Sequence, residues 1–236
     1  MNKLSSKLIS AIAMLYMTTA GAAVVEYDFV AEAAGNEGGY SSYMSDGDSA
    51  GATVVTVTGG NVAGTTSYYA YLDDLDVDNR PGGMGVCQVL EAGEGSECLD
   101  SADDNLGDGV PGGEMLTLSW GQVVTINEIV FRNFVHRTDF AADQDFQIRI
   151  DGGAWAEYSL THIFTTSLVG STFDFITDDT FGFNGCTSAL CADLSDTQLY
   201  ISSLVIQTPE PGMVVLFLVG VGLVAFSTRR RTQTQV

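Results

Sequence analysis

Apolar and polar residues alternate with a period of two along much of the chain between residues 24 and 208. Side chains on a β-strand point to opposite faces in turn, so this alternation predicts strands that bury one face and expose the other. The clearest cases are three sets of alternating apolar residues: Leu116, Leu118 and Trp120; Phe146, Ile148 and Ile150; and Phe173 and Phe175.

Eight segments of this region are rich in β-branched and aromatic residues and are predicted to be strands. No part of the region has a convincing amphipathic helical pattern, and Asp151-Gly152-Gly153 predicts a tight turn between two strands. We therefore expect an all-β domain, an antiparallel two-sheet sandwich of the jelly-roll type. The predicted strands cover residues 24–30, 52–59, 67–73, 114–120, 123–135, 145–153, 171–178 and 197–208.

Residues 73–113 form a long polar stretch rich in Gly, Asp and Glu. A connection of this length is usually functional or held by other means. The four cysteines of the chain fall into two local pairs, and local disulfides Cys87–Cys98 and Cys186–Cys191 are favoured among the three connectivities that four cysteines allow. A zinc site that uses these cysteines with His136 and His162 is the weaker alternative.

The first 23 residues have the features of a signal peptide. Lys3 and Lys7 are followed by a charge-free, largely apolar stretch, and Ala20-Gly21-Ala22 supplies the small residues that signal peptidase accepts. We expect cleavage after Ala22 or Ala23, and hence export into a compartment in which disulfides persist.

The C-terminal segment, residues 209–236, predicts one short membrane helix. The apolar run Met213–Phe226 has 14 residues, which as a helix spans about 21 Å. A bilayer core is about 30 Å thick, and extending the run to Gly212–Thr228 gives 17 residues, the lower limit for a span. Arg229, Arg230 and Arg231 would remain in the cytoplasm, which places the domain outside, in agreement with the signal peptide.

Removing both ends leaves a strongly acidic domain. Residues 24–208 contain 29 acidic residues, four arginines and no lysine, a formal net charge of −25. Such a charge repels phosphate backbones, which excludes nucleic acid as an expected partner. It attracts cations, calcium among them, but solubility outside the cell is the favoured explanation.

Two acidic clusters are the candidate calcium ligands. Asp74, Asp76 and Asp78 would share one face of an extended segment, beside Asp73 and Asn79, and a second cluster follows Cys98. Calcium prefers six to eight oxygen ligands, but neither cluster matches an EF-hand or a calcium-binding repeat. A solvated acidic loop and a structural Ca²⁺ site therefore both remain open. The candidate metal residues are Asp74, Asp76, Asp78, Asp103, Asp104 and Asp108.

No nucleophile elbow or zinc-protease motif occurs, so we expect no enzymatic activity, and a secreted hydrolase is the remaining third class. Aromatic residues on strands are more often core than surface, yet five of them are candidates for a sugar-stacking platform. Tyr69 is the one most expected to be exposed. The five are Tyr68, Tyr69, Tyr71, Trp120 and Trp155.

The C-terminal segment resembles the PEP-CTERM sorting signal of Gram-negative bacteria. The resemblance rests on Pro209-Glu210-Pro211, the apolar run Met213–Phe226 and Arg229-Arg230-Arg231, in that order at the end of the chain. It implies recognition and cleavage near Pro-Glu-Pro by an exosortase, after transient residence in the inner membrane. It also implies a host that makes extracellular polysaccharide, a candidate partner.

The expected organisation is thus a signal peptide (1–23), a β-sandwich ectodomain (24–208) and a sorting signal (209–236). The expected protein is exported, processed by an exosortase and delivered to the cell envelope or extracellular matrix, with a structural or adhesive role in biofilm or exopolysaccharide. A calcium-dependent carbohydrate-binding module is the alternative.

Overall fold

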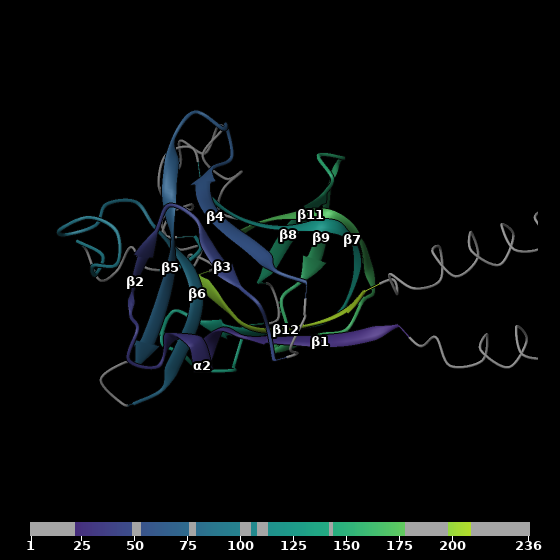
Figure 1. The fold of residues 1–236 in the computed structure, drawn as a ribbon, viewed down its shortest axis with the longest axis horizontal. Coiled ribbons are helices and arrows are strands. Elements are labelled where there is room, and N and C mark those ends of the chain that lie inside the picture. The colour runs from purple at the N-terminus through teal and green to yellow at the C-terminus, as the bar shows by residue number, and fades with distance from the viewer. Residues whose placement is uncertain are drawn as a thin grey trace, which may run out of the picture. The chain divides into compact units, whose positions relative to one another are not determined.

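The computed structural model describes residues 22–48, 53–75, 79–99, 105–107, 113–141, 144–177 and 198–208. Within it, Val24–Gln207 form one compact unit (Figure 1). Among the described residues, no helix is both long and apolar enough to span a bilayer. The predicted signal peptide and the predicted C-terminal membrane helix lie outside the described residues, apart from Ala22 and Ala23.

Strand is the dominant structure of the described residues, with very little helix, which confirms the all-β prediction. One short helix, α2 (Phe29–Ala33), follows the first strand. The strands are β1 (Ala23–Asp28), β2 (Gly38–Tyr40), β3 (Tyr43–Ser45), β4 (Val55–Asn61), β5 (Ser67–Leu75), β6 (Pro81–Cys87), β7 (Glu114–Asn133), β8 (Asp145–Ile150), β9 (Trp155–Ser159), β10 (Ile163–Phe164), β11 (Leu168–Thr177) and β12 (Leu199–Thr208).

All of these strands belong to one sheet, part of which closes on itself. Its order is β1-β12-β6-β5-β4-β7-β11-β8-β9, and β12 also pairs with β7. Strands β12, β6, β5, β4 and β7 therefore form a small closed barrel, from which β11, β8 and β9 continue as an open extension (Figure 1). The two separate sheets of the predicted sandwich are not confirmed.

Strand β7 closes the barrel, because its 20 residues pair with two different strands along the same edge. Its first part pairs with β4, from Glu114 to Trp120, and its second part pairs with β12, from Thr125 to Asn133. The register against β11 shifts between Gly170 and Thr172, which marks an irregularity in the middle of the pairing. Gly121 and Gln122, which separate the two shorter strands predicted here, are thus part of one continuous strand.

The interior follows the predicted alternation. Leu116, Leu118 and Trp120 of β7 are buried, as are Phe173 and Phe175 of β11. Trp120 lies edge-on to Phe173, with the ring centroids 5.6 Å apart, and its indole N–H donates to the Tyr27 hydroxyl at 3.1 Å. A buried tryptophan thus has the hydrogen-bond partner that its polar atom requires.

Part of the predicted long loop is regular structure. Asp73 belongs to β5, and β6 pairs with β5 from Pro81 onward. The sequence of β6 is rich in glycine because its neighbours leave no room for side chains. A Cβ at Gly82 would lie 2.6 Å from an Asp73 carboxylate oxygen, and one at Gly83 would lie 2.6 Å from the Ile201 carbonyl oxygen.

The first predicted strand is shorter than expected. Its last two residues, Phe29 and Val30, begin α2, because the Asp28 carboxylate accepts a hydrogen bond from the Ala31 amide at 3.0 Å and caps the helix. Five residues are too few to show a helical pattern in the sequence.

The tight turn at Asp151-Gly152-Gly153 is confirmed. Asp151 and Gly152 both have positive φ, 49° and 69°, and β9 begins shortly after it at Trp155. The Asp151 carboxylate accepts hydrogen bonds from the Ser171 and Thr172 amides, each at 2.9 Å, which lower the pKa of Asp151. The turn is therefore attached to β11, the strand on the other side of β8.

Candidate functional site

Five side chains form one line across the outer face of the sheet, from β4 and β7 of the barrel to β11, β8 and β9 of the open extension. Cross-strand pairing places Thr58 of β4 opposite Thr117 of β7, and Thr117 opposite Asp174 of β11. Asp174 in turn lies opposite Arg149 of β8, and Arg149 opposite Trp155 of β9. Each of the inner members has core residues on both sides in sequence, so the line faces away from the core. We call these five residues the outer row.

Polar contacts fix the centre of the outer row. Arg149 Nε donates to Asp174 Oδ2 at 2.7 Å, and the Thr117 hydroxyl donates to Asp174 Oδ1 at 2.7 Å. The Asp174 side chain is only 8% exposed, whereas that of Arg149 is 27% exposed. The guanidinium also lies against the Met115 sulfur, with Nη2 3.6 Å from Sδ. Charge-assisted hydrogen bonds of this kind hold an arginine in one orientation.

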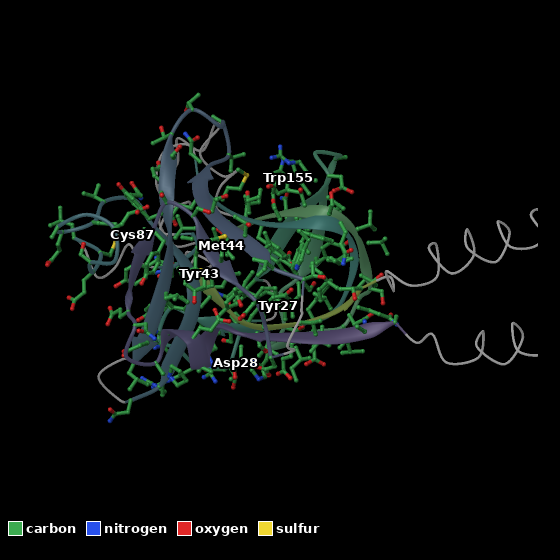
Figure 2. All side chains as sticks on the ribbon, in the orientation of Figure 1. Tyr27, Asp28, Tyr43, Met44, Cys87 and Trp155 are labelled. Atoms are coloured by element: carbon green, nitrogen blue, oxygen red, sulfur yellow. A yellow bond between two sulfur atoms is a disulfide. The ribbon has the colours of Figure 1, made fainter. Side chains whose placement is uncertain are left out.

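Trp155 ends the row at the edge strand β9 (Figure 2). The Arg149 guanidinium carbon lies 4.7 Å from the centre of the Trp155 ring, a cation–π arrangement. Trp155 is half-buried. The row therefore offers an aromatic ring, a guanidinium and hydroxyl groups in a fixed order.

The five aromatics of the predicted platform do not come together. Trp120 and Tyr71 are buried, and Tyr68 packs against the main core. Tyr69, expected to be exposed, is half-buried against a second small cluster. Of the five, Trp155 lies on the outer row. It therefore stays a candidate for sugar stacking, with Arg149 and the other row residues as neighbours instead of the four predicted aromatics.

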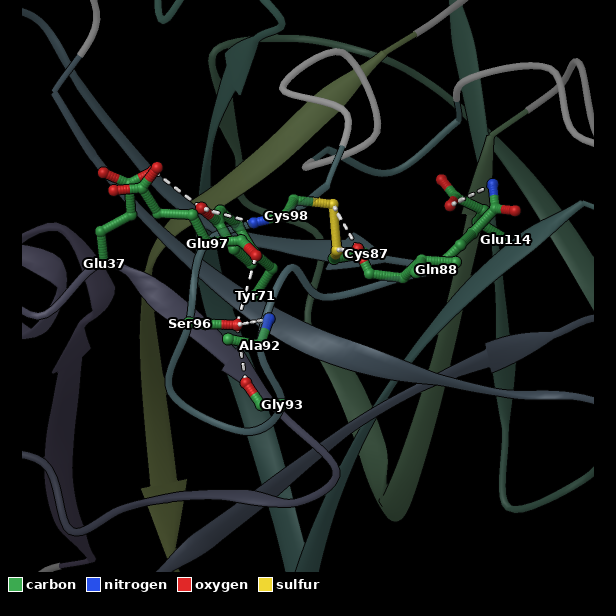
Figure 3. Close-up of a disulfide and its surroundings, with 11 residues drawn as sticks. Glu37, Tyr71, Cys87, Gln88, Ala92, Gly93, Ser96, Glu97, Cys98 and Glu114 are labelled. Carbon is green, nitrogen blue, oxygen red and sulfur yellow. Dashed lines mark hydrogen bonds between the residues drawn. A yellow bond between two sulfur atoms is a disulfide. The ribbon is translucent and has the colours of Figure 1, made fainter.

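The second cluster surrounds a disulfide between Cys87 and Cys98. Tyr71 of β5 packs against both cysteines, and its hydroxyl donates to Glu37 Oε1 at 2.7 Å (Figure 3). Leu90 covers the other side, against Gly39, where a Cβ would lie 2.3 Å from a Leu90 methyl carbon. The disulfide thus belongs to a small separate core beneath the polar loop.

The loop closed by this disulfide is attached to β2. The Gly95 amide donates to the Gly39 carbonyl at 2.8 Å, and the Gly39 amide donates to the Ser96 carbonyl at 3.1 Å. The Glu94 carboxylate accepts from the Ser41 amide at 2.8 Å and from the Ser41 hydroxyl. A loop that is polar in sequence is therefore ordered by backbone pairing.

Glu37 lies in an unfavourable place for a carboxylate. Partial burial raises the pKa of Glu37, and the nearby Asp73, Asp74 and Glu97 charges raise it further, against the opposing effect of the Tyr71 hydrogen bond. Acidic side chains thus converge here without a cation-binding arrangement: among the described residues, no three or more His, Cys, Asp or Glu side chains are grouped to hold a metal.

His136 is not a surface residue. It lies in the turn after β7 with φ 56°, and it is 4% exposed. Its Nδ1 is 2.6 Å from the Arg80 carbonyl oxygen, and its Nε2 is 2.6 Å from Asp73 Oδ2. The ring also meets Tyr200 edge-on, with centroids 5.0 Å apart. Asp73 is 5% exposed, so this member of the acidic run is a buried partner of histidine and not part of a solvated loop.

The predicted metal residues are mostly outside the described residues. Asp74 is described, and its Oδ2 accepts from the Gly35 amide at 3.3 Å. The other five, namely Asp76, Asp78, Asp103, Asp104 and Asp108, are not, and neither are Cys186, Cys191, Pro209, Glu210, Pro211, Arg229, Arg230 and Arg231. The structural Ca²⁺ site and its alternative, a solvated acidic loop, therefore both stay predictions.

Sequence reasoning missed Thr117, Asp174 and Arg149. Each is a polar residue between two apolar residues of an alternating strand, and that pattern indicates an outward position. Their alignment into one row depends on the register of strands far apart in sequence, which the pattern does not contain.

Comparison with known proteins adds one finding. A family model of the PEP-CTERM protein-sorting motif matches residues 207–231, so it includes the last two residues of β12. No curated protein and no solved structure matches the chain.

Proposed function

We propose that this chain, which carries the PEP-CTERM protein-sorting motif at residues 207–231, has a structural or adhesive role in the extracellular matrix or biofilm of its host. The motif carries the proposal, because it implies export, anchoring in the membrane and processing by an exosortase. The β-domain would then be the part that is delivered, and extracellular polysaccharide would be its surroundings.

Two features support a structural role outside the cell. His136 is buried, and both of its ring nitrogens lie against protein oxygens, as a structural histidine requires. The loop closed by Cys87–Cys98 is held by backbone hydrogen bonds to β2, which suits a stable extracellular domain.

Deletion of Pro209–Pro211 tests the sorting assignment. We expect the full chain to be exported but to remain in the inner-membrane fraction, whereas the unaltered chain is released. Deletion of three residues after the arginines, Thr232–Thr234, is the matched control and should leave release unchanged. Normal release of the Pro209–Pro211 deletion would contradict the proposal.

A calcium-dependent carbohydrate-binding module is the second candidate, and the outer row favours its carbohydrate part. Its calcium part is tested by thermal melts at constant ionic strength, with millimolar Ca²⁺ or with a chelator. If the acidic clusters bind Ca²⁺, the melting temperature rises with Ca²⁺ and the rise is lost in Asp76→Asn/Asp78→Asn. Equal melting temperatures in Ca²⁺ and chelator would remove the calcium part.

A further inference from the structure

We propose that the outer row is a binding site for a neutral glycan chain; this rests on the proposed function, since it names what the delivered domain would hold. The ligand class follows from three properties of the row: a fixed aromatic ring, unused hydrogen-bonding groups and an absence of net charge.

The ring of Trp155 is held in one orientation before a ligand binds. Arg149 lies against it, and Arg149 is itself fixed by Asp174, so the ring has a defined support. A tryptophan offers a large apolar face at a low cost in conformational entropy, and this cost falls further when the side chain is already ordered. The face of a sugar ring that carries C–H groups is the natural partner for such a surface.

Hydrogen-bonding groups stand beside the ring. The guanidinium of Arg149 has five N–H donors, of which Nε is used by Asp174 and Nη2 by Met115 within the described residues. The Thr117 hydroxyl donates to Asp174 and keeps its oxygen lone pairs for an incoming hydroxyl. Asp174 itself, nearly buried, orients both neighbours. Donors and acceptors are therefore fixed before any ligand arrives.

The charge of the row selects an uncharged ligand. Arg149 and Asp174 compensate each other, and the remaining three members are neutral. The domain around them has a formal net charge of −25, which repels a polyanionic chain. A neutral hexose polymer is not subject to this repulsion, whereas a polyuronate is.

The length of the row suits a chain more than a single sugar. It crosses five neighbouring strands, and strands in a sheet lie about 4.8 Å apart, so Thr58 and Trp155 are separated by about 19 Å. Several consecutive sugars would therefore be in contact at once.

Titration of the protein, purified from cells that express the full chain, with defined oligosaccharides tests this assignment. The neutral probes are hexasaccharides of β-glucan, mannan, galactan and dextran, and the charged probe is oligogalacturonate. We expect at least one neutral probe to bind by calorimetry, with affinity reduced tenfold or more in Trp155→Ala and severalfold in Arg149→Gln. Phe134→Ala removes an exposed aromatic outside the row and is the matched control. Thermal melts establish that each variant is folded.

Each remaining outcome overturns the proposal. Binding that survives in Trp155→Ala would place the site elsewhere, binding of oligogalacturonate alone would refute the neutral class, and no binding to any probe would refute the site. None of these results affects whether the protein is released after deletion of Pro209–Pro211, so the sorting assignment is tested independently of the glycan site.

Discussion

His136 and Asp73 show how two polar side chains can be buried together in this protein. The Arg80 carbonyl accepts a hydrogen bond, so Nδ1 of His136 must carry a proton, while Nε2 faces the Asp73 carboxylate. The Nε2–Oδ2 contact of 2.6 Å is an ion pair whenever the ring carries a proton on both nitrogens. This pair links the turn after β7 to β5.

Loss of this pair should destabilise the domain strongly. His136→Ala leaves the Asp73 carboxylate buried without its partner, and such a change typically costs about 3–5 kcal/mol. We expect chemical denaturation to show a loss of this order for His136→Ala and a much smaller one for His162→Ala, which removes a half-buried histidine. Additive effects of His136→Ala and Asp73→Asn in a double-mutant cycle would contradict direct pairing.

Glu37 predicts a specific dependence on pH. Its pKa in the folded protein is raised above the ordinary 4.5, so the folded state binds the proton more tightly than the unfolded state does. Stability from this group is therefore lost as pH rises, and the charged carboxylate costs stability at neutral pH. Glu37→Gln should melt at a higher temperature than the unaltered protein at pH 7, with the gap closing below pH 4.5.

The matched control for this comparison is Glu91→Gln, which neutralises an exposed carboxylate in the Cys87–Cys98 loop. It should change the melting temperature little at either pH. An equal or lower melting temperature of Glu37→Gln at pH 7 would show that the Tyr71 hydrogen bond, and not burial, dominates at this site.

At the scale of the elements, the stability of the Cys87–Cys98 loop should depend on its disulfide. The bond joins residues 11 apart, and closing a loop of this size stabilises a fold by about 2–3 kcal/mol. We expect Cys87→Ala/Cys98→Ala to lose stability of this order and to lose hydrogen-exchange protection at the Gly95 amide, which is bonded to Gly39. Cys186→Ala/Cys191→Ala should leave Gly95 protected; equal protection in both variants would contradict the prediction.

Strand β6 should be intolerant of side chains at Gly83. This residue has φ 130°, and a Cβ would meet the β12 backbone at 2.6 Å. Gly64 also has positive φ, 65°, but nothing lies within 4 Å of a Cβ there. Gly64→Ala therefore measures backbone strain alone, about 1–2 kcal/mol, whereas Gly83→Ala adds a clash with β12. Similar losses in the two variants, measured by denaturation, would show that β12 moves aside.

The same strands define what the sequence can reveal. Alternation located β7, β8, β11 and β12, because their buried faces are lined by large apolar residues. It missed β6, which has glycines where a side chain would clash with Asp73 or with the β12 backbone. Neither of these neighbours is adjacent to β6 in sequence. It also divided β7 in two, since Gly121 and Gln122 interrupt the run of apolar and β-branched residues but not the strand.

At the scale of the molecule, charge should set the response to salt. A domain with 29 acidic residues and four arginines repels itself when compact, and salt screens that repulsion, with a Debye length of about 30 Å at 0.01 M and about 3 Å at 1 M. We expect the melting temperature to rise steadily over this range of NaCl. A fall would show that ion pairs such as Arg149–Asp174 outweigh the net repulsion.

The destination of the protein is predicted from residues that are contiguous in the sequence. Its candidate binding surface is built from residues that are far apart in the sequence. Pro209-Glu210-Pro211, an apolar run and three arginines are contiguous, so the sorting motif is visible in the sequence and is matched by the family model. The outer row gathers residues from five strands, Thr58 to Trp155, and exists only once their register is set.

Strand β12 has a mechanical consequence if the segment that follows it is held in the membrane, as the sorting motif implies. It is the last described strand, its final two residues belong to the sorting motif, and it is hydrogen-bonded to β6 and β7, with β1 as a further neighbour. Tension applied at Thr208 pulls along the strand, while its hydrogen bonds run across it. Many bonds are then loaded in shear at once instead of parting one after another, so the domain should resist being unfolded by tension at Thr208.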